Sequence, residues 1–441
     1  MKKYIFVVSL LCLLAACTGK RQGEAAAEVA ALPAVEDVVM YQVNPRVFAP
    51  EKSFKAVERR LDSIQALGIN VVWFMPINEV GQEKSVNSPY CVKDYKGVNP
   101  EFGTLDEFKA LVATCHQKGM NVIIDWVANH TSWDNAWIAN KEWYTQDEAG
   151  NIIFPAGTGW KDVADLNFDN QEMRLAMIDA MKFWVTEIGI DGFRCDAADF
   201  VPFDFWKQAL DSLRAIPERS LLMLAEGKRR DHFDAGFDMN YSWDFLETLR
   251  DVFIKDAPAP ELFATDKAEY DTIPVGKVKL RFTTNHDESA KMSPTKEFGD
   301  VRGSMAAFVL TTYLHGGALI YGSQEAGYPE AINFFTYVPV DWTGNSELYQ
   351  EYCRLMALYN EYPAIRKGGL KTYPQPDVLL FEKQDGKDRV LVAVNVRNRE
   401  VNVTLPQEWN GHPSRDMYSG TEEKLEAELS LCPYQYRIFK Y

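Results

Sequence analysis

The sequence is poor in cysteine, in positive charge and in apolar runs long enough for a membrane. Its seven cysteines are scattered along 441 residues with no CxxC pair, which argues against a disulfide framework and against a cysteine-based zinc site. Lys and Arg total 47 against 63 Asp and Glu, a formal charge of −16. This balance argues against a nucleic-acid partner and against adhesion of the folded part to anionic lipid. The apolar run at residues 4–14 is too short to cross a bilayer.

The remaining composition is that of an ordinary globular protein. Hydrophobic residues make up 46% and charged residues 25%, which rules out wholesale disorder. Aromatic residues reach 13%. They suit a ligand with flat apolar faces and hydroxyls, such as a sugar, and they also suit a large core. The length allows a barrel domain together with a smaller domain.

The first residues resemble a bacterial lipoprotein signal. Lys2 and Lys3 precede the apolar run, which ends in Leu14-Ala15-Ala16-Cys17. We expect residues 1–16 to be a signal peptide and Cys17 to be the lipidated anchor; a plain signal peptide with a chance cysteine is the alternative. Residues 17–36, rich in Ala, Glu and Gly, are expected to form a flexible tether. The predicted location is the cell envelope, facing the periplasm or the cell surface.

Strand-like and helix-like segments alternate along residues 37–366, which predicts an α/β fold, a (β/α)₈ TIM barrel. The order breaks at about 131–169, a Trp-, Gly- and Asn-rich insertion after the third strand, and from 367–441 the pattern predicts a C-terminal antiparallel β-sandwich domain. The expected barrel strands are 38–43, 70–76, 121–126, 190–195, 221–225, 236–239, 278–283 and 318–321, and the expected helices include 54–67, 105–118, 171–188, 205–215 and 304–314.

Acidic residues follow several of these strands. Asp196, Glu226 and Asp287 come at the ends of the fourth, fifth and seventh strands. The carboxyl ends of barrel strands meet at one rim, so the three carboxylates should converge there, with Arg194, His130 and His286 beside them. Carboxylates that pack together repel one another, so one pKa should rise. A protonated carboxyl facing an ionised one is the equipment of retaining glycoside hydrolysis.

These segments resemble the four sequence regions of the α-amylase family, glycoside hydrolase family 13, in the family's order. The four regions lie at 125–130, 192–197, 224–227 and 285–287, a fifth short region at 164–167, and the first strand, the stacking-tyrosine loop and the eighth strand at 41–46, 88–95 and 319–325. The resemblance covers about Val38 to Tyr441.

The resemblance implies a role for each matched residue. Asp196 would be the nucleophile, Glu226 the general acid and then base, and Asp287 the stabiliser of the transition state. Arg194, two residues before Asp196 on the same strand face, would keep the nucleophile ionised. The sugar in the −1 subsite would be bound by residues of three loops: His130 and His286 on ring hydroxyls and Tyr90 stacked beneath the ring.

At two places this chain differs from the sequence pattern common in the α-amylase family. Many starch-degrading members carry a basic residue and His where this chain has Asp199-Phe200, and an aromatic residue commonly follows the acid where this chain has Gly227-Lys228-Arg229; both changes alter the leaving-group side.

In calcium-binding members, the positions of Asn129 and Asp165 supply ligands, and such oxygen donors suit Ca²⁺. The alternative is that both residues only tie the insertion to the barrel. No organic cofactor is expected.

Three functions remain open at this stage. The first is a hydrolase of α-1,4-glucan or malto-oligosaccharide. The second is an α-glucan transglycosylase or isomerase on the same barrel, which would share Asp196, Glu226 and Asp287. The third is a sugar-binding lipoprotein without catalysis, against which the intact carboxylate trio speaks. The expected partners are an α-glucan substrate and, through the lipid anchor only, a membrane.

Overall fold

The computed structural model describes residues 31–440. The predicted signal peptide, Cys17 and most of the predicted tether lie outside the described residues. Within the described range, no helix combines the length and the apolar character that a membrane crossing requires. The five cysteines in this range are all free; Cys91, Cys115 and Cys195 are buried and Cys432 is exposed.

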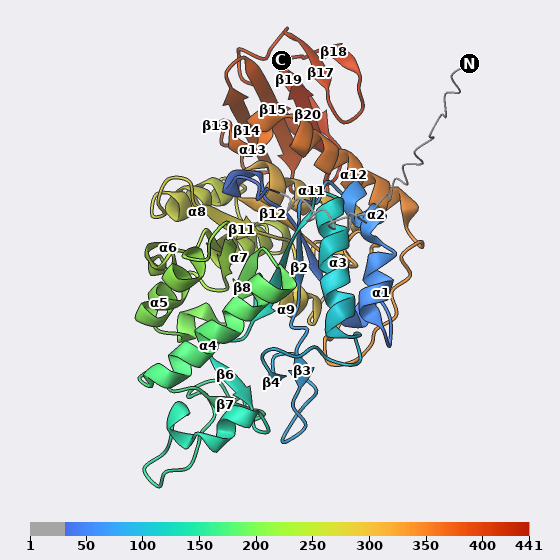
Figure 1. Ribbon diagram of the computed structural model, residues 1–441. Helices are drawn as coiled ribbons and strands as arrows, with labels where there is room; N and C mark the ends of the chain where they lie inside the picture. Colours follow the sequence, from blue (N-terminus) through green and yellow to red (C-terminus); the bar gives the residue numbers. More distant parts are fainter. Residues whose placement is uncertain (1–30, 441) are drawn as a thin grey trace, which may run out of the picture.

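Eight parallel strands close into a barrel in the order β1-β12-β11-β10-β9-β8-β5-β2, which confirms the predicted fold (Figure 1). Every strand is buried along its whole length, as expected for parallel strands covered by helices on the outside. The strands are β1 (Val39–Val43), β2 (Val71–Phe74), β5 (Asn121–Trp126), β8 (Gly192–Cys195), β9 (Leu222–Ala225), β10 (Met239–Tyr241), β11 (Val278–Arg281) and β12 (Gly317–Tyr321).

Helices surround the barrel, and their termini follow local sequence signals. In α3, for example, Thr104 and Glu107 form a reciprocal capping box at the first turn. The helices are α1 (Ser53–Glu58), α2 (Leu61–Ala66), α3 (Leu105–Gln117), α4 (Gln171–Phe183), α5 (Phe203–Arg214), α6 (Asp231–Ala235), α7 (Trp243–Ile254), α8 (Glu261–Tyr270), α9 (His286–Ser289), α10 (Pro294–Glu297), α11 (Val301–Tyr313), α12 (Ser346–Glu361) and α13 (Pro363–Lys367).

Two element predictions were wrong in detail. The single helix expected over 54–67 is interrupted at Arg59–Arg60 and forms α1 and α2. The guanidinium of Arg60 lies 4.3 Å from the ring centroid of Trp342, a contact that local sequence does not reveal. The sixth strand, expected at 236–239, is displaced to Met239–Tyr241, because Gly236 adopts a φ of 116° and ends α6.

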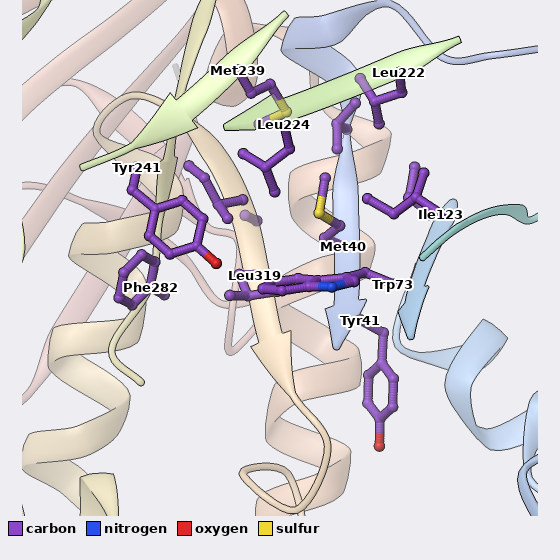
Figure 2. Close-up of a cluster of buried hydrophobic side chains, with 14 of the residues drawn as sticks. Met40, Tyr41, Trp73, Ile123, Leu222, Leu224, Met239, Tyr241, Phe282 and Leu319 are labelled. Atoms are coloured by element: carbon purple, nitrogen blue, oxygen red, sulfur yellow. The ribbon is translucent and has the colours of Figure 1, made fainter. Parts of the chain in front are cut away.

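The interior of the barrel supports the site from below. Figure 2 shows the indole of Trp73 edge-on, with Leu319 beside it and Met40, Ile123, Leu222, Leu224 and Met239 above it in this view. Trp73 is fully buried, and the guanidinium of Arg194 lies 5.3 Å from its ring centroid. The indole of Trp73 therefore forms the top of the apolar core, directly beneath Arg194.

Two loop excursions lie at the end of the barrel away from the C-terminal domain (Figure 1). The first holds the short hairpin of β3 (Glu79–Val80) and β4 (Val92–Asp94). The second is the predicted insertion, in which β6 (His130–Ser132) pairs with β7 (Val163–Asp165). Between β6 and β7 the chain forms short 3₁₀ turns and an isolated bridge between Gln146 and Ile152, without a long helix, as the absence of a helical pattern predicted.

The C-terminal domain is antiparallel, as predicted, and its two sheets enclose a separate apolar cluster. The larger sheet supplies Val378, Leu391 and Phe439 to this cluster, and the smaller sheet supplies Val403 and Leu431. The larger sheet runs β13 (Gly369–Thr372), β14 (Val378–Asp385), β15 (Asp388–Asn395), β20 (Tyr436–Lys440), β17 (Pro413–Asp416), β18 (Glu422–Lys424), and the smaller pairs β16 (Val401–Thr404) with β19 (Glu428–Leu431).

Candidate active site

A pocket of about 330 Å³ opens at the carboxyl ends of the barrel strands. Asp196 follows β8, Glu226 follows β9 and Asp287 lies in α9 after β11, so three separate loops bring the predicted carboxylates to one pocket. The pocket is lined by Val86, Ser88, Tyr90, His130, Trp160, Asp162, Val163, Asp196, Ala197, Glu226, His286, Asp287, Phe334 and Phe335. The predicted sugar-binding residues Tyr90, His130 and His286 are thus brought together with the carboxylates, while Arg194 lies beneath them.

One guanidinium holds three carboxylates. Nη1 of Arg194 lies 2.6 Å from Oδ1 of Asp125 and 2.9 Å from Oδ1 of Asp196, and Nη2 lies 2.8 Å from Oε1 of Glu226. Its Nε donates to the hydroxyl of Tyr241 at 3.2 Å. Arg194 is fully buried, so its hydrogen bonds to Asp125 and Asp196 are charge-assisted bonds in a medium of low dielectric constant. Its contact with Glu226 is an ion pair. The predicted contact between Arg194 and the nucleophile candidate is present.

Glu226 is also held by backbone. Its Oε2 accepts a hydrogen bond of 2.7 Å from the amide of Ala197, directly after Asp196. Ala197 has a φ of 44°, a left-handed conformation that is costly for a residue other than glycine. The strain turns the Ala197 amide toward the Glu226 carboxylate, so the loops after β8 and β9 meet at the two catalytic candidates.

A second chain of hydrogen bonds fixes the sugar-binding candidates. Nε2 of Gln42 lies 2.8 Å from Nδ1 of His286, and Nε2 of His286 lies 2.6 Å from the hydroxyl of Tyr90. The amide of Gln42 donates to Nδ1, which leaves the imidazole hydrogen on Nε2, directed at the Tyr90 oxygen. The Tyr90 hydroxyl in turn donates to Oδ2 of Asp125 at 3.2 Å. The rings of Tyr90 and His286 stack with centroids 5.4 Å apart.

Burial dominates the electrostatics of the cluster. It raises the pKa of the Asp196 carboxyl, a rise that the Arg194 guanidinium opposes and the Glu226 carboxylate reinforces. Burial likewise raises the pKa of Asp287, again opposed by Arg194, so at Asp287 burial and not repulsion within the carboxylate trio causes the rise. Burial lowers the pKa of His130 to about 4 and that of His286 to about 3, and the Arg194 charge adds to the shift at His286. Both imidazoles are therefore neutral near pH 7.

Aromatic side chains from the insertion and from the loop after β8 border the pocket. The ring of Trp160 lies 5.5 Å from His130 and 5.6 Å from Phe200, centroid to centroid. Phe200 is 56% exposed, which is unusual for a phenylalanine and leaves its face open to a ligand. Trp160 lines the pocket, and Phe200 lies beside Trp160 without lining the pocket.

Asn129 and Asp165, the predicted calcium ligands, lie on adjacent segments. The backbone of His130 pairs with that of Asp165 in the β6–β7 ladder, and the amide of Leu166 donates to the carbonyl of Asn129 at 3.2 Å. In the part of the chain that the structure describes, no three His, Cys, Asp or Glu side chains gather into a metal-binding group. The two side chains alone fall short of the six to eight oxygens that Ca²⁺ takes. Calcium at this place stays a prediction.

Several site residues were not assigned a role from the sequence. Asp125 lies inside β5, and a charged residue in an otherwise apolar strand is a signal that a buried partner exists. Gln42 in β1 and Tyr241 in β10 gave no comparable signal. Phe334 and Phe335 lie in the loop after β12, whose course the sequence pattern did not define.

Comparison with known proteins agrees with this geometry. Residues 53–156 and 143–219 match the family model of the alpha amylase catalytic domain, and residues 370–438 match that of the maltogenic amylase C-terminal domain. A cyclomaltodextrinase of Geobacillus thermopakistaniensis is 25% identical over 92% of this chain and 77% of its own length. An alpha-amylase of Haloarcula japonica is 26% identical over 87% of this chain and 58% of its own length.

A solved structure gives the same picture. The noncanonic maltogenic alpha-amylase of Thermotoga neapolitana superposes with a TM-score of 0.84 at 25% identity, and the superposition covers 93% of this chain and 99% of that one. The barrel and the C-terminal domain therefore occur together in that protein as they do here.

Proposed function

We propose that this α-amylase-type glycoside hydrolase cleaves α-1,4-glucosidic bonds in starch-derived glucans or malto-oligosaccharides, with retention of configuration. The enzyme class follows from the family matches. The substrate class is supported by the relatives, whose names describe a cyclomaltodextrinase and amylases. The observation that carries the mechanism is the shared guanidinium of Arg194, which contacts Asp196 at 2.9 Å and Glu226 at 2.8 Å.

The proposed reaction has two displacements. In the first, a carboxylate oxygen of Asp196 attacks the anomeric carbon, the bond to the leaving oxygen breaks, and Glu226 gives that oxygen a proton. In the second, Glu226 takes a proton from water, the water oxygen bonds to the anomeric carbon, and the Asp196 carboxylate is released. Two carboxylates on one guanidinium suit a retaining enzyme, whose pair lies about 5–5.5 Å apart.

The neighbouring residues suit this assignment. Asp287 lines the pocket and is more exposed than Asp196, as a group that binds sugar hydroxyls must be. One carboxylate oxygen of Glu226 forms an ion pair with Nη2 of Arg194, and the other accepts a hydrogen bond from the Ala197 amide. Acid catalysis therefore requires Glu226 to give up one of these contacts when the glycosidic oxygen arrives. Neutral His130 can bond a sugar hydroxyl, whereas His286 would have to exchange Gln42 or Tyr90, the present partners of its two ring nitrogens, to do so.

Product analysis on maltoheptaose tests the proposal. Hydrolysis gives only sugars shorter than seven units. Longer products would show that a sugar takes the glycosyl group in place of water, which is the transglycosylase alternative. The ring of Trp160, which lines the pocket, and the exposed ring of Phe200 beside it are the features that would hold such an acceptor. If maltoheptaose were unchanged, the proposed function would be wrong.

We further propose that the enzyme is a lipoprotein of the cell envelope, anchored through Cys17 and facing the periplasm or the cell surface. The support is the sequence alone: a basic start, a short apolar run and Leu14-Ala15-Ala16 directly before the cysteine.

A further inference from the structure

The carboxylate of Asp199 joins the loop that follows the nucleophile candidate to the loop that follows the acid candidate. Asp199 lies in the 3₁₀ turn Ala198–Phe200, three residues after Asp196. Its Oδ2 accepts a hydrogen bond of 3.2 Å from the backbone amide of Lys228, and its Oδ1 accepts one of 3.3 Å from that of Arg229. Both amides lie within three residues of Glu226. Asp199 itself does not line the pocket.

Further hydrogen bonds join the two loops. We call this set of contacts between residues 198–199 and residues 226–229 the clamp. Nη1 of Arg229 donates to the carbonyl of Asp199 at 3.0 Å, and the guanidinium of Arg229 is held in a bidentate ion pair with Asp231 at 3.0 and 2.7 Å. On the other side, the amide of Ala198 donates to the carbonyl of Glu226 at 3.0 Å. Glu226 therefore lies between two sets of bonds that run from one loop to the other.

In the clamp, the carboxylate of Asp199 comes so close to the backbone of residue 227 that only glycine fits there. Gly227 has a φ of 155°, and a Cβ built there would lie 2.4 Å from Oδ1 of Asp199 and 2.8 Å from the ring of His232. The buried ring of His232 closes the clamp from behind, with Nε2 3.3 Å from Oδ1 of Asp199. The residues that depart from the pattern of related enzymes, at 199 and at 227–229, are thus partners of one another.

We propose that Asp199 is a positioning residue for the general acid: it holds the backbone after Glu226 so that the Glu226 carboxyl meets the leaving-group oxygen. The inference rests on the proposed function of Glu226. Where related enzymes often carry a basic residue, this chain places a carboxylate that is bonded to the neighbouring loop.

The test compares two substrates that differ in their need for an acid. Maltoheptaose needs a proton on its leaving oxygen, whereas fluoride leaves from α-maltosyl fluoride without one. We expect Asp199→Ala to lower kcat/KM about 10- to 100-fold on maltoheptaose, the cost of a misplaced catalytic group, and less than about threefold on the fluoride. Glu226→Gln should show the same asymmetry with a loss on the order of 10²–10⁴-fold on maltoheptaose.

Controls separate positioning from loss of structure. Asp179→Asn removes a surface carboxylate that pairs with Lys96 and is 72% exposed, and it should change neither rate. Asp199→Asn keeps the size of the side chain but can accept only one of the two amide hydrogens, so it should show the same asymmetry if Asp199→Ala does not fold. Equal losses on both substrates, or no loss on either, would overturn the role of Asp199. A wild-type enzyme that cleaves neither substrate would overturn the proposed function itself.

Discussion

Replacing the nucleophile candidate should separate activity from stability. In Asp196→Asn the side chain keeps its shape but cannot form the glycosyl ester. We expect kcat on maltoheptaose to fall at least about 10³-fold, because covalent catalysis is lost and only positioning and electrostatics remain. At 1.36 kcal/mol per decade, this loss corresponds to about 4 kcal/mol in the barrier.

The same substitution should not destabilise the fold. Asp196 is only 8% exposed, and burial raises its pKa, so near pH 7 its ionised form costs folding free energy. Arg194 keeps Asp125 and Glu226 as partners after the substitution. We therefore expect Asp196→Asn to be at least as stable as the wild type. The free energy of unfolding should rise by at most about 1 kcal/mol, because functional residues are often held at a cost to stability.

The assay is kcat on maltoheptaose together with Tm from calorimetry. Asp211→Asn serves as the matched control, because Asp211 is 61% exposed and pairs with Lys207 on the surface of α5; its effect on stability should stay within about 0.5 kcal/mol. A variant at position 196 that keeps most of its activity would refute the nucleophile assignment. A fall in Tm of many degrees would refute the electrostatic reasoning.

Two further predictions concern location and pH. Cys17→Ala should move the protein from the membrane fraction to the soluble fraction, since no helix among residues 31–440 can span a membrane; a variant that stays in the membrane pellet would show another anchor. For His286, the folded pKa of about 3 lies below the ordinary value of 6.5, so the stability it contributes is present above about pH 6.5 and is lost as the pH falls toward 3. Between pH 6.5 and 5, wild type should lose about 1.5 kcal/mol more unfolding free energy than His286→Gln in urea titrations, and parallel losses would contradict the reasoning.

The barrel was predicted from the alternation of strand and helix signals together with the resemblance to the α-amylase family, which guided the count of eight strands. Buried parallel strands are continuous apolar runs, and the helices between them have clear periodicity. The acidic residues Asp196, Glu226 and Asp287 come just after the ends of predicted strands, and the barrel topology brings these strand ends to one rim. The contact between Arg194 and Asp196 was predicted from their spacing on one strand face; the contacts of Arg194 with Asp125 and Glu226 were not.

The details that the sequence did not predict depend on contacts between distant segments. The hydrogen bond from the Ala197 amide to Glu226 needs a left-handed residue that no composition rule assigns to alanine. Gln42 reaches His286 across 244 residues of chain. In the C-terminal domain, β17 and β18 have little local signal, since Glu422–Lys424 contains no apolar residue and Pro413–Asp416 contains only the proline. Pairing in the sheet makes them strands.

The anomeric configuration of the first product tests the central claim most directly. Asp196 attacks one face of the anomeric carbon, and water later attacks the other, so the two displacements restore the starting configuration. Proton NMR of maltoheptaose during the first minutes of cleavage should therefore show the α-anomer of the new reducing end before mutarotation mixes the two. A β-anomer appearing first would mean a single displacement by water and would contradict the assignment of Asp196 as nucleophile.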